Sequence, residues 1–276
     1  MSAVTPRAAA RPSQEGALGW ALLRLCSIAV YIFMFAPIVV VILLAFNSSR
    51  SGAFPMEGFS LQWFGKLFAN ESIVEAFKTS LILAATSSAL ATVIGVMAAL
   101  ALVRYDFRGK EGVQTFLSLP LLMPEVVMGV ALLMFLKFLS MPRSFAVLLL
   151  GHTVLSLPYV VLLVQARLVG LRSSYEEAAW TLGANRIQTF FEVTLPLISP
   201  AIVGGFLFAA TLSFDNITAT LFWKKPGIET VPTKIFAMLR TSVSPEINAL
   251  GAVMIVITIL LPLIGGYMVR RFAKAR

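Results

Sequence analysis

Residues 172–196 read RSSYEEAAWTLGANRIQTFFEVTLP and form a polar interruption in a chain that is otherwise largely apolar. Ser173-Ser174 is expected to cap the start of a helix, with acidic residues in its first turn facing the positive end of the helix dipole. Gly183 supplies the left-handed residue that ends this helix, and Leu195-Pro196 is expected to end a second one. The pattern predicts a helix–turn–helix that a partner can grip; an ordinary amphipathic hairpin is the alternative.

The composition of the chain is typical of an integral membrane protein. Hydrophobic residues make up 58% of it and charged residues 13%, which excludes a soluble domain of ordinary composition. Six windows are long enough to cross about 30 Å of hydrocarbon as helices. They are residues 26–46, 79–103, 113–136, 144–166, 193–214 and 247–269. Only the third window contains a charged residue, Glu125. We therefore expect an all-α integral membrane protein with six transmembrane helices.

The basic residues indicate how the chain is oriented. Thirteen of the 22 lie in the connections that share a side with both termini and the polar segment, and nine lie in the others. Because Lys and Arg favour the cytoplasmic side, we expect both termini and the polar segment in the cytoplasm. No cleavable signal is evident, so the first span is retained as an anchor. The net charge of +9 then reflects membrane placement rather than nucleic-acid binding.

The rest of the chain divides around these spans. We expect a flexible cytoplasmic N-terminus at residues 1–20, a first span at 21–46, an outer connection at 47–78, a five-helix core at 79–269 and a basic cytoplasmic tail at 270–276. Pro120 and Pro124 in the third span and Pro158 in the fourth are expected to kink or break their helices. Short helices are expected around Trp63 and at residues 233–240.

Residues that carry catalytic chemistry are scarce. The single Cys26 can form neither an intrachain disulfide nor a metal site, and His152 has no second ligand at metal-binding spacing. No nucleophile triad and no Gly-rich phosphate loop is present in the sequence. The pattern argues against a membrane-embedded enzyme, and we expect no catalytic site, metal or cofactor on this chain.

Two acidic residues at membrane depth are the candidates for a substrate path. Glu125 lies twelve residues into the third span, roughly 18 Å along a helix, and Asp215 lies roughly 25 Å along the fifth. Charged groups at this depth face a bundle interior or a wet cavity, where carboxylates can replace the water that a cation sheds. For Glu125 a second interpretation stays open, in which His152 comes to the same depth and satisfies it.

Two aromatic residues are weaker candidates. Tyr105 lies at a membrane interface, where aromatic belts are expected, and could equally help gate the cytoplasmic end; we favour the belt. Trp63 could meet a soluble partner, cover an outer vestibule or serve as an interfacial anchor.

The polar segment resembles the EAA loop of binding-protein-dependent ABC importer permeases. The match consists of Glu177-Ala178-Ala179, three residues, Gly183, nine residues, and Val193-x-Leu195-Pro196. Residues 46–50, 104–110 and 244–250 also resemble the shorter permease subunit of spermidine/putrescine importers. The resemblance implies a type I permease fold with a cytoplasmic EAA coupling helix, at residues 172–196, between spans four and five.

The same resemblance implies partners and a cargo. These are a second permease subunit in a heterodimer, two ATPase subunits that bind ATP and Mg²⁺, a periplasmic substrate-binding protein and the lipid of a bacterial inner membrane. Glu177 would pair with a basic group on the ATPase or cap its own helix. Similar polyamine permeases commonly have two adjacent acids where this chain has Asp215-Asn216. Asn216 adds no charge, which leaves room for a smaller cationic or zwitterionic amine.

An ion-coupled secondary transporter is the alternative function. Glu125 and Asp215 would then be proton-coupling groups rather than substrate ligands. Such a transporter has no need of a cytoplasmic hairpin with the EAA spacing, so the polar segment favours the ATP-driven importer.

Overall fold

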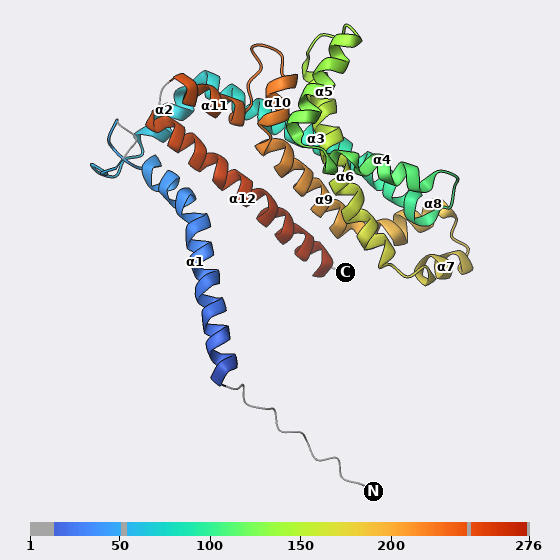
Figure 1. The fold of residues 1–276 in the computed structure, drawn as a ribbon. Helices are drawn as coiled ribbons and strands as arrows, with labels where there is room; N and C mark the ends of the chain where they lie inside the picture. Colours follow the sequence, from blue (N-terminus) through green and yellow to red (C-terminus); the bar gives the residue numbers. More distant parts are fainter. Residues whose placement is uncertain (1–13, 51–53, 242–243, 275–276) are drawn as a thin grey trace.

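The computed structural model describes residues 14–50, 54–241 and 244–274, and in these ranges the chain is almost entirely helical (Figure 1). A lone β-bridge joins Asn47 and Phe59. The helices are α1 (Gln14–Ala45), α2 (Gln62–Ala69), α3 (Glu71–Arg104), α4 (Lys110–Leu122), α5 (Glu125–Phe138), α6 (Phe145–Val169), α7 (Ser174–Thr181), α8 (Arg186–Thr189), the π-helical η1 (Phe190–Thr194), α9 (Leu195–Asp215), α10 (Thr218–Trp223), α11 (Val231–Thr241) and α12 (Pro245–Lys274).

Five of these helical stretches are long and apolar enough to cross a membrane, and the bent pair α4–α5 supplies a sixth crossing if it is counted as one span. The expected all-α membrane fold is therefore confirmed. The first helix begins at Gln14, inside the segment expected to be flexible. Residues 1–13 and 275–276, which belong to the expected N-terminal segment and basic tail, lie outside the described residues.

Helices α3, α6 and α9 form the centre of the bundle. Val160 of α6 is fully buried between α3 and α9. The Val160 side chain packs against Gly95 of α3. A Cβ atom at position 95 would lie 2.8 Å from Val160 Cγ1, so only glycine lets α3 approach α6 this closely. Small residues at such contacts are typical of helices that pack inside a bilayer, because close backbone approach replaces the missing hydrophobic driving force.

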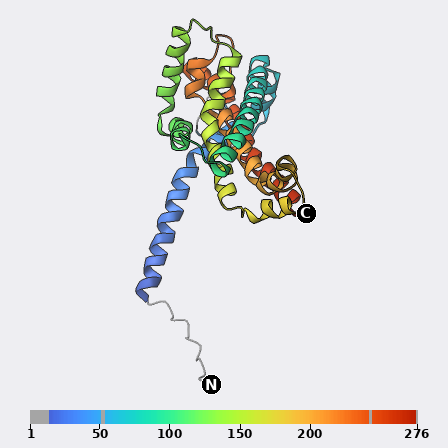
Figure 2. The same ribbon diagram turned by 90° about the vertical axis from the view of Figure 1, so that its right-hand side faces the viewer.

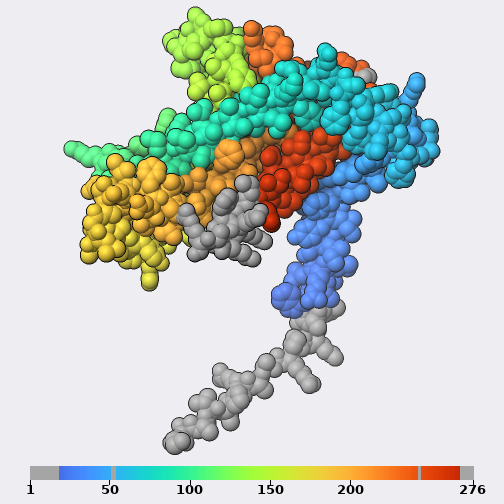
Figure 3. Space-filling model, turned by 180° about the vertical axis from the view of Figure 1, so that it is seen from behind, coloured from blue at the N-terminus to red at the C-terminus, as the bar shows by residue number. Residues whose placement is uncertain are grey.

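Helix α1 leaves this body at an angle and contacts it mainly through α12 (Figures 1 and 2). Its apolar side chains are exposed along most of its length. The space-filling view from behind shows this helix projecting from the bundle (Figure 3). In Figure 1, α1 begins and α12 ends on the side away from α2 and α11. We call the end of the bundle that carries residues 172–194 the hairpin end, and the end that carries α2, α10 and α11 the far end.

The third span is broken rather than merely kinked. Helices α4 and α5 meet at 110°. Met123 between them is extended, with φ −95° and ψ 134°, because a residue that precedes a proline is excluded from the helical region and Pro124 follows. Pro120 and Pro158, by contrast, lie within unbroken helices.

Candidate functional site

The hairpin, residues 172–194, contains the expected turn at Gly183. Gly183 has φ +93° and follows α7, which ends at Thr181. Its N–H donates to the carbonyl of Trp180 at 2.9 Å, and the next N–H, of Ala184, donates to the carbonyl of Ala179 at 3.0 Å. These two bonds form a Schellman motif, which satisfies the carbonyls at the end of the helix and needs a left-handed residue.

The expected caps of this hairpin are partly wrong. Ser173 occupies the N-cap position of α7 but makes no side-chain cap; its carbonyl accepts from the N–H groups of Glu176 and Glu177 instead. The real capping box is at the second helix, where Asn185 accepts from the Gln188 N–H and the Gln188 side chain accepts from the Asn185 N–H, both at 2.9 Å.

Leu195-Pro196 does not end the second helix, as the sequence had suggested. The chain is helical without a break from Arg186 to Asp215. The five-residue η1 turn precedes the proline, and the Leu195 N–H donates to the carbonyl of Phe190, five residues back. Such a wider turn gives the proline ring room that a regular helix lacks. The hairpin is thereby joined directly to the fifth span.

Glu176 fixes the hairpin to the bundle. Its side chain is buried, with the residue 8% exposed. Its Oε1 accepts from Thr194 Oγ1 at 2.7 Å and from Arg104 Nη2 at 3.2 Å, while Arg104 Nε lies 3.2 Å from Oε2. Arg104 is the last residue of α3 and Thr194 the last of η1. One carboxylate therefore links α7 to the ends of the second and fifth spans.

The EAA residues themselves lie at the surface. Glu177 and Ala178 are exposed, and Glu177 makes no side-chain hydrogen bond to a described residue, so it does not cap its own helix. Around them the hairpin exposes large apolar side chains, with Leu182 at 90%. The others are Tyr175, Trp180, Ile187 and Phe191. An exposed apolar patch of this kind marks an interaction surface.

Tyr105 lies beside the hairpin rather than alone at the interface. It follows α3 and lines a groove of about 580 Å³ between the end of α3 and the hairpin, together with Arg104, Glu176 and Trp180. Tyr105 is therefore placed at the junction between the second span and the hairpin.

Asp215 is the last residue of α9 and is half-buried. Its Oδ1 accepts from Thr258 Oγ1 of α12 at 2.9 Å. A carboxylate at a helix C-terminus faces the negative end of the helix dipole, so this position does not help the helix. The hydrogen bond from Thr258 therefore links the end of α9 to α12, and the carboxylate stays partly open.

Asn216 is buried, and its side-chain and backbone oxygens both accept hydrogen bonds. Its Oδ1 accepts from the N–H of Thr220 at 3.2 Å, and its carbonyl accepts from Thr220 Oγ1 at 2.8 Å. Both bonds hold the first turn of α10 against the end of α9. The oxygens of Asn216 are thus engaged in local contacts with Thr220.

A buried network that the sequence did not reveal connects four helices near Asp215. His152 Nδ1 lies 2.7 Å from Ser213 Oγ, and His152 Nε2 lies 2.9 Å from Thr220 Oγ1. Ser87 Oγ of α3 donates to Ser213 Oγ at 3.0 Å. His152 is 1% exposed and both its nitrogens are used, so it does not satisfy Glu125. In the sequence these residues stand far apart and carry no shared motif.

Glu125 and Trp63 have different surroundings from those that the sequence suggested. Glu125 is exposed in the first turn of α5, directly after the break in the third span, and makes no hydrogen bond or ion pair with a described residue. Trp63 is buried, and its Nε1 donates to the carbonyl of Asn47 at 2.6 Å. It anchors α2 to the end of α1 and presents little surface to a soluble partner.

Within residues 14–50, 54–241 and 244–274, no three His, Cys, Asp or Glu side chains gather where they could hold a metal ion. The candidate site therefore consists of two parts, the hairpin with its Glu176 contact and the far-end carboxylate Asp215 with the hydrogen-bonded network beside it.

Known proteins resemble this chain in sequence over most of its length. It is 36% identical over 242 residues to the spermidine/putrescine transport system permease protein PotC of Haemophilus influenzae, covering 88% of this chain and 94% of that protein. It is 37% identical to PotC of Escherichia coli K12, over 84% of this chain and 88% of that one. The putrescine transport system permease protein PotI of the same organism is 35% identical, over 89% and 90%.

Solved structures share the fold. A bacterial ABC transporter involved in the import of the acidic polysaccharide alginate matches with a TM-score of 0.74 at 18% identity, over 94% of this chain and 96% of that one. The MetNI methionine ABC transporter matches with a TM-score of 0.60 at 15% identity, over 78% and 99%. Residues 91–276 match the family model of the binding-protein-dependent transport system inner membrane component. The chain therefore belongs to this family of inner-membrane permeases.

Proposed function

We propose that this chain is a permease subunit of an ATP-driven importer and forms half of the translocation path for polyamines or a related small organic amine. The observation that carries the proposal is the identity of 35–37% to polyamine permeases over most of both chains. The half-buried carboxylate of Asp215, at the edge of an apolar bundle, supports a cationic cargo.

The hairpin is the contact for a cytoplasmic ATPase. The apolar side chains around Glu177 and Ala178 support this assignment, because they are exposed on a short polar hairpin. Glu177, which has no described partner, is free to pair with a basic group of the ATPase. The hairpin end and both termini are then cytoplasmic, and the far end faces the periplasm, where a substrate-binding protein delivers the cargo.

The hairpin moves as a rigid body and so transmits a movement of the ATPase to the membrane spans. Glu176 ties α7 to α3 through Arg104, and η1 joins α8, the second helix of the hairpin, to α9 without a break. Helices α3 and α9 pack on α6, so a displacement of the hairpin shifts the centre of the bundle together. ATP and Mg²⁺ are held by two partner ATPases, and a second permease completes the path.

The neutral residue Asn216 next to Asp215 limits the class of amine that we expect the importer to carry. Asn216 carries no charge, and its oxygens already bond to Thr220. In the Asp215-Asn216 pair, Asp215 therefore supplies the only carboxylate that can bind an ammonium group. We therefore expect a preference for a small amine with few charges over a longer polycation.

The test is uptake into proteoliposomes that contain the assembled importer and its binding protein, with spermidine or putrescine as cargo. Asp215→Asn keeps an oxygen for Thr258 but removes the charge, so we expect normal assembly and an uptake rate lower by about tenfold or more. Asp106→Asn is the control, because Asp106 is a fully exposed acid in a loop.

Three results would contradict the proposal in different ways. Unchanged uptake by Asp215→Asn removes Asp215 from the path. Uptake that persists on an ion gradient without hydrolysable ATP favours the ion-coupled transporter. If the unaltered complex takes up neither spermidine nor putrescine, the proposal of a polyamine cargo is wrong.

A further inference from the structure

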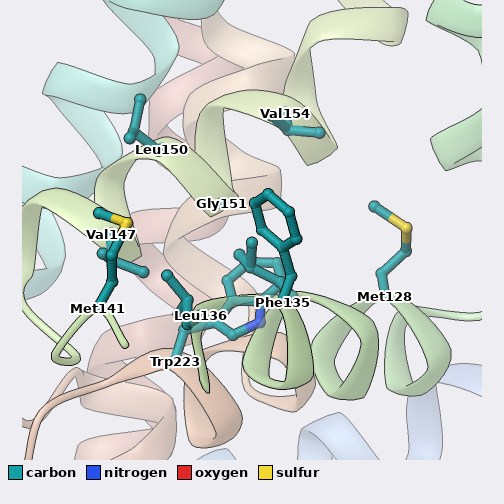
Figure 4. Close-up of a pocket in the computed structure, with 10 residues that line it drawn as sticks. Met128, Phe135, Leu136, Met141, Val147, Leu150, Gly151, Val154 and Trp223 are labelled. Carbon is teal, nitrogen blue, oxygen red and sulfur yellow. The ribbon is translucent and has the colours of Figure 1, made fainter. Parts of the chain in front are cut away.

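An apolar cleft lies beside the fourth span, between α5 and α6. Helices α5 and α6 are joined by residues 139–144 but stand apart, and α5 is held mainly by α10. Between them is a cleft of about 210 Å³ whose lining is almost wholly apolar (Figure 4). Phe135 and Met128 face it from α5, and Leu150 and Val154 from α6.

The floor of the cleft leaves no polar group unpaired. It is formed by Trp223 of α10, whose ring packs against Gly151. The Trp223 Nε1 donates to the carbonyl of Gly129 at 2.9 Å, so its one polar atom is satisfied beneath the cleft. Dry apolar cavities of about 150 Å³ already admit small hydrocarbons. A hydrocarbon chain, rather than water or a polar cargo, fits this lining.

Two cations stand at the mouth of the cleft. An adjoining hollow of about 320 Å³ shares Leu136 and Met141 with it and is also lined by Lys137 and Arg143. Both cations are exposed, and neither forms an ion pair with a described residue. An apolar slot with a cationic mouth matches the two chemical halves of a phospholipid, because Lys and Arg bind phosphate while their stems cover apolar surface.

We propose that this cleft is a binding site for a phospholipid, with one acyl chain between α5 and α6 and the phosphate at Lys137 and Arg143. The α5–α6 connection lies at the opposite end of α6 from the hairpin, so the lipid comes from the leaflet at the far end. The bound chain fills the space between α5, which is held mainly by α10, and α6 at the centre of the bundle. It therefore supports α5, which begins at Glu125.

The test uses the assembled importer in vesicles that contain phosphatidylglycerol with a photoreactive group in the middle of one acyl chain. After illumination, mass spectrometry locates the labelled residues. We expect labels to concentrate on residues 128–136 and 147–154. Lys137→Gln combined with Arg143→Gln should reduce this labelling about tenfold, as expected for the loss of a charge-assisted contact. Val154→Phe, which fills the cleft, should reduce it similarly.

Matched controls separate a site from general contact with the bilayer. Lys78→Gln removes another exposed cation, and Val93→Phe enlarges an exposed apolar residue on α3. Both should leave the labelling of the cleft unchanged. Labels spread evenly over α1, α3 and α12 would overturn the proposal, as would an unlabelled cleft covered by the second permease. If Lys137→Gln combined with Arg143→Gln leaves the labelling of the cleft unchanged, these two residues do not bind the phosphate.

Discussion

The two ends of the bundle are held by different kinds of polar contact. At the hairpin end, an ion pair between Arg104 and Glu176 joins elements that are partly open to water. At the far end, His152, Ser213, Thr220 and Ser87 join four helices through neutral hydrogen bonds, and the residues are almost completely buried. The difference follows from desolvation, because burying a charge is far more expensive than burying a hydrogen-bonded hydroxyl or imidazole.

The contrast matches the two tasks proposed for these ends. The hairpin must transmit force without detaching, and a charged contact in which Glu176 bonds to two partners is strong at a boundary with water. The far end must hold helices α3, α6, α9 and α10 in register beside Asp215 without competing for a cationic cargo. Neutral side chains do this, since they add no charge of either sign to the path.

The largest effect is expected from breaking the ion pair. Glu176→Ala leaves Arg104 partly buried without its partner, which costs about 3 kcal/mol. Hydrogen exchange of the α7 amides, measured in the permease subunits before the ATPase is added, should then become about 100-fold faster. Glu177→Ala, one residue along, is the matched control and should leave this exchange unchanged while weakening ATPase association. Equal exchange in the two variants would show that Glu176 does not hold the hairpin.

A smaller effect is expected at the turn. Gly183→Val forces a β-branched residue to φ +93°, at a cost of about 2 kcal/mol or more, and abolishes the Schellman geometry. We expect normal membrane insertion but no co-purification of the ATPase. Gly109→Val imposes similar strain at φ +87° in a turn outside the hairpin. If both variants lose the ATPase equally, the loss reflects general instability rather than the hairpin.

The smallest effect is expected at the far end. His152→Leu removes two neutral hydrogen bonds, but Ser213 and Thr220 keep their contacts with Ser87 and Asn216. We expect the apparent Tm of the detergent-solubilised complex to fall by about 5 °C, with the hairpin exchange unaffected. Ser118→Ala, which removes one exposed hydrogen bond, is the control. A change in α7 exchange would show that the two ends are not independently held.

Much of this molecule could be predicted from local sequence. Apolar windows indicated the spans, because helices in a bilayer must be apolar and of a certain length. Gly183 indicated the turn of the hairpin, because few other residues adopt φ +93°. Pro120, Pro124 and Pro158 all indicated a kink or a break, because proline acts on its immediate neighbours, but the helix is interrupted only beside Pro124.

The partners across the fold could not be predicted in this way. Glu176 and Glu177 are adjacent and chemically identical, and only the packing of α7 decided which one was buried against Arg104, 72 residues away. Likewise, the continuation of the helix through Leu195-Pro196 depended on the wider η1 turn. The sequence by itself determined the spans and the turn, since these depend on neighbouring residues. Only the tertiary structure decided which polar side chains meet, because such contacts depend on how separate helices pack.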